Sequence, residues 1–234
     1  NTGKIKSMVE NGISGITSNP SIFQKALSNE DSYDDEIKLL TDSGINDPKK
    51  IFQKLSIKDI SDACKILLPV YENKGGSDGF VSIEIDPKFS KNTDESIKEG
   101  IYLYESINQP NVMIKVPGTS EGIPVIEKLI SLGINVNVTL LFSRDMYRKS
   151  AKAYIKGLEK INSEKTDIRY VNSVASFFIS RIDTEVDKVI DNKNKGKVAI
   201  WNAKKADEDY EDIFSKENFK DILNKGGKAQ KLLW

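Results

Sequence analysis

Short apolar runs of strand length alternate along the chain with longer segments of helical periodicity. We predict strands at residues 12–17, 79–85, 111–116, 134–141 and 169–175. When helices separate successive strands, each helix returns the chain to the same end of the sheet, so the strands run parallel and the helices cover them. No low-complexity linker interrupts this pattern. We therefore expect an α/β fold in which residues 1–234 form a single domain.

The clearest predicted helix spans residues 120–133. Ser120 is placed to cap its first turn, the apolar positions step by three and four, and Gly133 ends it. Residues 1–11 also have a helical pattern, and an opening helix normally follows a strand in such a fold. Residues 225–234 contain a glycine break and then the start of an apolar run. We therefore expect the sheet to lack its first strand and its last strands.

The composition of the chain excludes several classes of function. The chain has 35 basic and 35 acidic residues, which argues against a nucleic-acid partner. It has no histidine, which is the commonest general base and metal ligand. We therefore expect no metal site, and we expect other groups to act as the general acid and base. The single cysteine, Cys64, is predicted to be a small core residue. With no apolar run near the roughly 18 residues of a membrane span and no export signal, we expect a cytoplasmic protein without a membrane partner.

Lys115 stands inside the apolar run of residues 111–116, two residues before Pro117. One interpretation is an edge-strand lysine that reaches solvent and blocks aggregation. The other is a lysine in a central strand. Burial disfavours the charged form of an amine, and a neutral amine can attack a carbonyl to form a Schiff base. The polar residues on neighbouring strands favour the second interpretation.

Those polar residues share one face of the predicted sheet. Because side chains alternate along a strand, parity gathers Asn19, Glu84, Lys115, Asn137 and Thr139 away from the apolar face, and Thr17 has the parity of Asn19. Each lies at or near the C-terminal end of its strand. In a (β/α)8 TIM barrel the face without helices is the interior, and the carboxyl ends of the strands carry the active site. We therefore expect an incomplete (β/α)8 barrel with a reaction centre at these residues.

Each of these residues also has a structural interpretation when it is taken alone. Glu84 fits a structural carboxylate paired with a lysine, and Asn137 fits a hydrogen-bonded residue of a barrel core. Asn19, just before a proline, fits an ordinary turn. Beside an amine nucleophile, however, Glu84 and Thr139 are better explained as groups that position water or move protons.

Arg181 follows the last predicted strand and is one of only four arginines. It fits a surface arginine paired with Asp183, or a phosphate clamp formed with Ser176, since guanidinium and hydroxyl groups both suit phosphate oxygens. The scarcity of arginine favours the clamp. Arg144 and Arg148, on a predicted helix, are expected to form solvated pairs with nearby acids.

At these residues the chain resembles the transaldolases, class I aldolases of the pentose phosphate pathway. The matching stretches are GISGITSNPSIFQKAL, VSIEIDP, VMIKVPGTSEGIPVIEKLISLGINVNVTLLFS and VASFFISRID, and they occur in the family's order. The resemblance implies that Lys115 forms a Schiff base with fructose 6-phosphate or sedoheptulose 7-phosphate. A dihydroxyacetone unit would then pass from Lys115 to an aldose phosphate.

The resemblance also implies roles for individual residues. It makes Lys115, Glu84 and Thr139 catalytic, and it makes Thr17, Asn19, Asn137, Ser176 and Arg181 substrate-binding. No metal or organic cofactor is needed, because the protonated imine is the electron sink. The implied partners are sugar phosphates, and the implied assembly is a monomer or homodimer. The family's first-strand aspartate and seventh-strand basic residue have no counterpart here. Because five strands cannot close a barrel of eight, we expect this chain by itself to turn over substrate poorly.

Two alternatives stay open. One is a fructose-6-phosphate-type aldolase, a lyase that shares the lysine but releases free product. The other is a non-catalytic barrel fragment that only binds sugar phosphate. The insertion between Asn19 and Glu84, with predicted helices at residues 32–44 and 57–75, fits transaldolases and exceeds what short aldolases carry there.

Overall fold

The computed structural model of the chain describes residues 3–29 and 33–234, and within them one parallel sheet forms the centre of the molecule. Its strands are β1 (Ile16–Thr17), β2 (Val81–Glu84), β3 (Val112–Pro117), β4 (Val136–Leu141), β5 (Ser173–Phe177) and β6 (Lys231–Leu233). They neighbour one another in chain order, and every neighbouring pair is parallel. The predicted α/β class and parallel sheet are confirmed.

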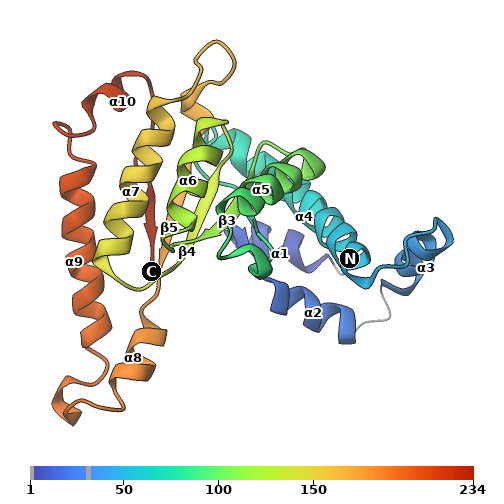
Figure 1. Cartoon of the computed structure of the whole chain (residues 1–234), viewed down its shortest axis with the longest axis horizontal. Helices are drawn as coiled ribbons and strands as arrows, with labels where there is room; N and C mark the ends of the chain where they lie inside the picture. Colours follow the sequence, from blue (N-terminus) through green and yellow to red (C-terminus); the bar gives the residue numbers. More distant parts are fainter. Residues whose placement is uncertain (1–2, 30–32) are drawn as a thin grey trace.

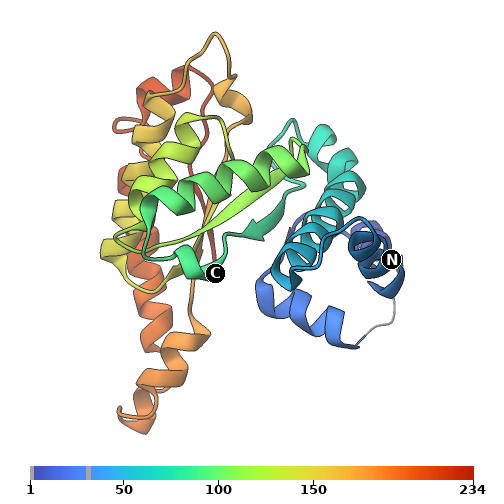
Figure 2. The same ribbon diagram turned by 45° about the vertical axis from the view of Figure 1, so that its right-hand side comes forward.

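Helices cover the outer side of the curled sheet (Figure 1). The helices of the described residues are α1 (Lys4–Glu10), α2 (Pro20–Asn29), α3 (Asp34–Asp42), α4 (Pro48–Asn73), α5 (Thr93–Ile107), α6 (Gly122–Ser131), α7 (Arg144–Glu159), α8 (Ser180–Val186), α9 (Val198–Ile213) and α10 (Lys220–Asn224). Around the sheet α4, α5, α6, α7 and α9 pack each against the next. The arrangement is an incomplete TIM-barrel-like fold, as the sequence predicted. Figure 2 shows α8 and the start of α9 extending beyond the end of the sheet.

The core lies between the sheet and these helices. Val81, Ile114 and Val138 point outward from neighbouring strands and pack in one apolar cluster with Leu67 of α4 and Leu129 of α6. Each such side chain contributes about 1.5–3 kcal/mol when it is fully buried. The apolar parity of the strands therefore faces the helices, and the polar parity is left on the concave side.

Two predicted strand boundaries are wrong for local reasons. The strand predicted at residues 12–17 covers only Ile16–Thr17, because Gly12 has a φ of +97° and turns the chain as it leaves α1. The strand predicted at residues 169–175 is instead Ser173–Phe177. A 3-10 turn, η3 (Ile168–Tyr170), holds the chain before that strand begins.

The cap predicted for the helix of residues 120–133 is also wrong. The helix begins at Gly122, and its first N–H groups are met by Thr119, whose Oγ1 accepts a hydrogen bond from the Gly122 N–H at 3.1 Å. Ser120 is therefore not the capping residue. Gly133 has a φ of +82° after the last turn, which confirms the predicted end of the helix.

Several further predictions concern the helices. The helix predicted over residues 1–11 corresponds to α1, with residues 1 and 2 outside the described part. The helices predicted at 32–44 and 57–75 correspond to α3 and α4, with residue 32 also outside it. Cys64 is fully buried in α4 as predicted, and burial raises the pKa of its thiol to about 12. Among the described helices, none has the length and apolar character needed to cross a membrane.

Candidate active site

Lys115 lies in the middle of the sheet, on its concave side. In the strand register it is directly opposite Glu84 of β2 and Asn137 of β4. Its Nζ donates hydrogen bonds to Glu84 Oε2 and to the Ser18 carbonyl oxygen, both at 2.9 Å. The residue is only 8% exposed. Because β3 has a strand on each side, the edge-strand interpretation of Lys115 is wrong.

The chemistry open to this lysine follows from its two acceptors. An ammonium group has three N–H donors, and two are used by the Glu84 carboxylate and the Ser18 carbonyl. Both partners are strand or loop groups that fix the direction of the side chain. Passage of one proton along the bond to Glu84 would leave a neutral amine beside a carboxylic acid, which is the pairing that carbonyl addition requires.

A second polar network crosses the sheet at Asn137, which is 1% exposed. Its Nδ2 donates to Ser82 Oγ on β2 at 3.0 Å, and its Oδ1 accepts from Ser176 Oγ on β5 at 2.9 Å. The network fixes the Asn137 amide in one orientation beside Lys115. Two of the predicted substrate-binding residues, Asn137 and Ser176, therefore lie in direct contact.

The other predicted site residues lie around Lys115 and differ in how deeply they are buried. Thr139 is buried on β4 opposite Pro117, two residues beyond Lys115 in the direction of the carboxyl ends. Thr17 lies opposite Ser82 at the β1 edge and is exposed. The Asn19 Oδ1 accepts from the Ile22 N–H at 2.9 Å, so this oxygen caps the first turn of α2 as a turn-forming asparagine would.

A hollow of about 290 Å³ opens on the concave side of the sheet. Its lining includes Thr17, Ser82, Met113, Asn137 and Lys231, which come from five strands. Asn137 belongs both to this hollow and to the polar network beside Lys115. Lys115 and Glu84 do not line it, and lining residues such as Asp78, Asn172 and Lys228 precede their strands, so the hollow lies toward the amino ends of the strands.

Arg181 is exposed at the start of α8, beyond the carboxyl end of β5. Its guanidinium lies 4.7 Å from the centre of the Phe178 ring. The alternative pairing with Asp183 is not formed among the described residues, where Asp183 Oδ1 accepts a hydrogen bond from the Ala199 N–H at 3.0 Å. Ser176 bonds to Asn137, and in the part of the chain described here no hydrogen bond joins it to Arg181.

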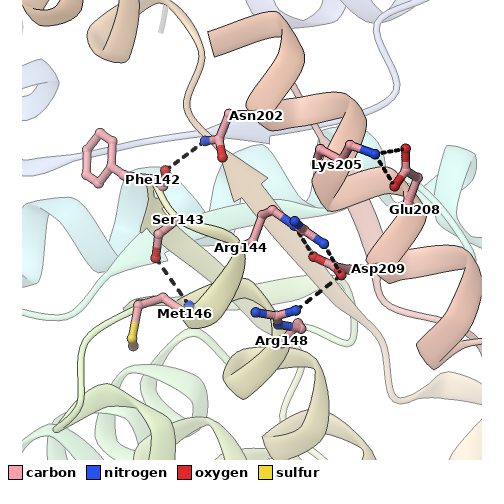
Figure 3. Close-up of polar contacts among 9 residues, drawn as sticks. All are labelled: Phe142, Ser143, Arg144, Met146, Arg148, Asn202, Lys205, Glu208 and Asp209. Atoms are coloured by element: carbon pink, nitrogen blue, oxygen red, sulfur yellow. Dashed lines mark hydrogen bonds and ion pairs between the residues drawn. The ribbon is translucent and has the colours of Figure 1, made fainter. Parts of the chain in front are cut away.

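Arg144 and Arg148 also differ from the sequence prediction. Instead of solvated pairs with local acids, both reach Asp209 of α9, whose side chain is only 10% exposed. Arg144 donates two hydrogen bonds to this carboxylate, at 2.8 and 2.9 Å. The pair of Arg144 and Asp209 therefore links the start of α7 to α9 (Figure 3).

Two residues near Lys115, Ser18 and Ser82, are not among the predicted site residues. Ser18 contributes a backbone carbonyl, which no side-chain pattern reveals. Ser82 has the same parity as Glu84, and that parity was the available signal for its place in the network. No cluster of three or more acidic, histidine or cysteine side chains suited to a metal ion occurs among residues 3–29 and 33–234.

The fold and the site together define a class. A helix-covered parallel sheet, curled as part of a TIM-type barrel, places a buried lysine and its carboxylate partner on the concave face. A family model described as Transaldolase/Fructose-6-phosphate aldolase matches residues 1–223. The chain belongs to this transaldolase/fructose-6-phosphate aldolase family.

Individual relatives agree with the family match. The chain is 46% identical over 252 residues to a protein of Trichodesmium erythraeum named Transaldolase, and 46% identical over 250 residues to one of Nostoc sp. named Transaldolase 2. Both alignments cover 100% of this chain and 65% of the relative. A transaldolase of Neisseria meningitidis serogroup A is 39% identical over 233 residues, which cover 100% of the chain and 66% of that protein. The chain thus spans about two thirds of the length of these relatives.

Proposed function

We propose that this chain carries the Schiff-base centre of a transaldolase. The observation that supports it most is the Lys115–Glu84 pair, joined at 2.9 Å on the concave face of the incomplete barrel, in a chain that belongs to this family. In this proposal the protein transfers a dihydroxyacetone unit from fructose 6-phosphate or sedoheptulose 7-phosphate to an aldose phosphate. No cofactor takes part, because the protonated imine draws the electrons of the breaking carbon–carbon bond.

The proposed first steps use Lys115 and Glu84. Glu84 takes a proton from Lys115, and the neutral amine adds to the keto carbonyl of the sugar. Loss of water from the resulting carbinolamine gives the imine, with Glu84 and Thr139 holding the water that leaves. The C4 hydroxyl of the donor then gives its proton to the water held by Glu84 and Thr139, and the C3–C4 bond breaks. An aldose phosphate leaves, and the electrons of the broken bond form an enamine on Lys115. The enamine then adds to the acceptor aldehyde, and water returns to release the product.

The proposed binding roles follow the residues' places along the strands. Asn137, held in one orientation by Ser82 and Ser176, would bind the hydroxyl groups of the dihydroxyacetone unit. Asn19 and Thr17 would approach the same unit from the β1 side. Arg181 would bind the phosphate at the far end of the sugar, together with Ser176 when the serine hydroxyl turns from Asn137.

We propose further that residues 1–234 act as one domain, since one apolar cluster joins elements from α4 to α10. We propose a monomer or a homodimer, which light scattering will distinguish, and a cytoplasmic location. The last proposal is supported by the single, buried cysteine, because a reducing compartment leaves such a thiol free.

An exchange assay on the full-length gene product tests the function. Fructose 6-phosphate is supplied with and without erythrose 4-phosphate, and the sugar phosphates formed are followed by mass spectrometry. We expect rapid transfer with the acceptor and little free dihydroxyacetone without it. Lys115→Ala should abolish transfer, whereas Lys128→Ala, which removes an exposed lysine of α6, should leave it unchanged.

The same assay separates the alternatives. Rapid release of free dihydroxyacetone without acceptor would identify an aldolase lyase. The absence of any carbon–carbon cleavage would support the alternative of a non-catalytic fragment that only binds sugar phosphate. Persistent transfer by the Lys115→Ala variant would contradict the proposed mechanism.

A further inference from the structure

The guanidinium of Arg181 is held by an aromatic ring and not by an acid. It lies 4.7 Å from the centre of the Phe178 ring, and among the residues that the structure describes Arg181 forms no ion pair with a carboxylate. Glu185, one helical turn further along α8, is paired with Lys188. A guanidinium on a ring face keeps its N–H donors at the edge, where an anion can approach them.

The Phe178 ring is itself held by Phe142. The two ring centres are 5.2 Å apart and the planes meet at 74°, an edge-to-face contact. Both residues directly follow a paired position of the sheet, Leu141 opposite Phe177. The Phe178 N–H also donates to the Leu141 carbonyl at 2.8 Å, so backbone and side chains fix the same relationship.

The backbone before Phe142 is unusual. Leu140 has a φ of +59°, in the left-handed region that a bulky residue rarely occupies, and the register of β4 and β5 shifts between Val138 and Leu141. After this irregularity Leu141 is buried in the core and Phe142 is exposed. The local conformation thus directs the Phe142 ring out of the core and toward Phe178.

Two side chains of α9, Asn202 and Asp209, contact the segment that carries Phe142 and Arg144 (Figure 3). Asn202 Nδ2 donates to the Phe142 carbonyl oxygen at 2.9 Å. Two residues further along, Arg144 donates to the Asp209 carboxylate with two hydrogen bonds. Together these contacts fix the segment that carries Phe142 against a helix that lies outside the sheet.

We infer that Phe142 is a positioning residue for phosphate binding: its ring fixes Phe178, and Phe178 fixes the Arg181 guanidinium beyond the end of β5. This inference rests on the proposed function, in which Arg181 binds the substrate phosphate. Phe142 also borders the shallow hollow lined by Arg181, Ile182, Thr184, Glu185 and Val186, which gives an anion access to the arginine.

The test compares donors with and without a phosphate. KM and kcat are measured for fructose 6-phosphate and for fructose with the full-length gene product, its Phe142→Leu and Phe142→Tyr variants, and Tyr102→Leu as a matched control. Tyr102 of α5 and Phe142 are both 41% exposed. Loss of one aromatic contact should raise KM for fructose 6-phosphate about fivefold in Phe142→Leu, with kcat nearly unchanged.

The comparison with fructose makes the test specific. KM for fructose should not change, Phe142→Tyr should recover most of the affinity because it keeps the ring, and Tyr102→Leu should match the unaltered protein. Asn202→Ala, which removes the bond to the Phe142 carbonyl, should shift KM in the same direction but less. An equal rise of KM for both sugars, a fall of kcat alone, or no change at all would overturn the inference.

A binding measurement separates this inference from the proposed function. Inorganic phosphate is titrated calorimetrically into the unaltered protein and the Phe142→Leu variant, with the folding of both checked by circular dichroism. Weaker phosphate binding by about fivefold in the variant supports the inference even if no sugar is cleaved. Equal phosphate affinity overturns it, even if transfer activity is found.

Discussion

Lys115 and Glu84 lie directly opposite each other on adjacent parallel strands, and their side chains meet at 2.9 Å on the concave face of the sheet. The two side chains are 9% and 18% exposed. Removing one member of such a pair leaves the other charge in a poorly hydrated place. The pair therefore makes a prediction about stability that does not depend on turnover.

Lys115→Met and Glu84→Gln should each lower the free energy of unfolding by about 1–3 kcal/mol. The double variant should be more stable than the sum of the single effects predicts, because neither charge is then left alone. Urea unfolding of the four proteins at pH 7 measures this coupling. Effects that simply add, within about 0.5 kcal/mol, would show that the two groups are not coupled.

Asp209 gives a prediction that depends on pH. The hydrogen bonds from Arg144 hold the pKa of this carboxyl below its usual value, with burial opposing them and the Arg148 charge adding to them. Its contribution to stability is thus present above its unfolded pKa of about 3.9 and is lost as the pH falls through the lower folded value. Asp209→Asn should cost about 1 kcal/mol at pH 7, and the difference from the unaltered protein should shrink below pH ~4.

Urea unfolding between pH 7 and pH 3 follows this difference. Asp145→Asn, which removes the acid of an exposed pair with Lys149, is the control and should show a smaller effect. A stability difference for Asp209→Asn that stays constant down to pH 3 would contradict the assigned cause.

Gly122 is required by the tight passage from β3 into α6. A Cβ at this position would lie 2.0 Å from the Pro117 carbonyl oxygen, at the end of the strand that carries Lys115. Gly122→Ala should lower the free energy of unfolding by about 1–3 kcal/mol or more, because backbone atoms must move. Gly15→Ala is the control, since its Cβ would meet the Phe80 carbonyl at an ordinary 3.5 Å. Equal stability of the two variants in urea would be the contrary result.

Cys64 should be chemically silent in the folded protein. It is fully buried, and burial raises the pKa of its thiol to about 12, so almost no thiolate is available near neutral pH. We expect no reaction with an aromatic disulfide reagent at pH 8 until urea unfolds the chain, after which one equivalent reacts. Rapid stoichiometric reaction of the native protein would contradict the described packing of α4.

The sequence predicts the parts of this fold that depend on periodicity. Strand parity correctly separates Ile114, which faces the helices, from Lys115, which faces the concave side, and it places Glu84 and Asn137 beside that lysine. Boundaries are harder, because they depend on turns: Gly12 shortens the first strand.

The sequence pattern does not predict contacts between segments that are far apart along the chain. Arg144 pairs with Asp209 of α9, which is 65 positions away in the sequence, and not with the acidic residues that are closer in sequence. The φ of Leu140 also has no signature in the residues around it, since nothing there calls for a left-handed turn. The Ser18 carbonyl that accepts from Lys115 is invisible for a different reason: it is a backbone group. Tertiary packing decides each of these features.

The central claim is that the Lys115 amine forms a covalent bond with a ketose, and reductive trapping tests it most directly. Sodium borohydride is added to the full-length gene product with fructose 6-phosphate, and the modified peptide is identified by mass spectrometry. We predict a reduced three-carbon adduct on Lys115, which is lost in Lys115→Met. An adduct on any other lysine, or no adduct at all, would contradict the claim.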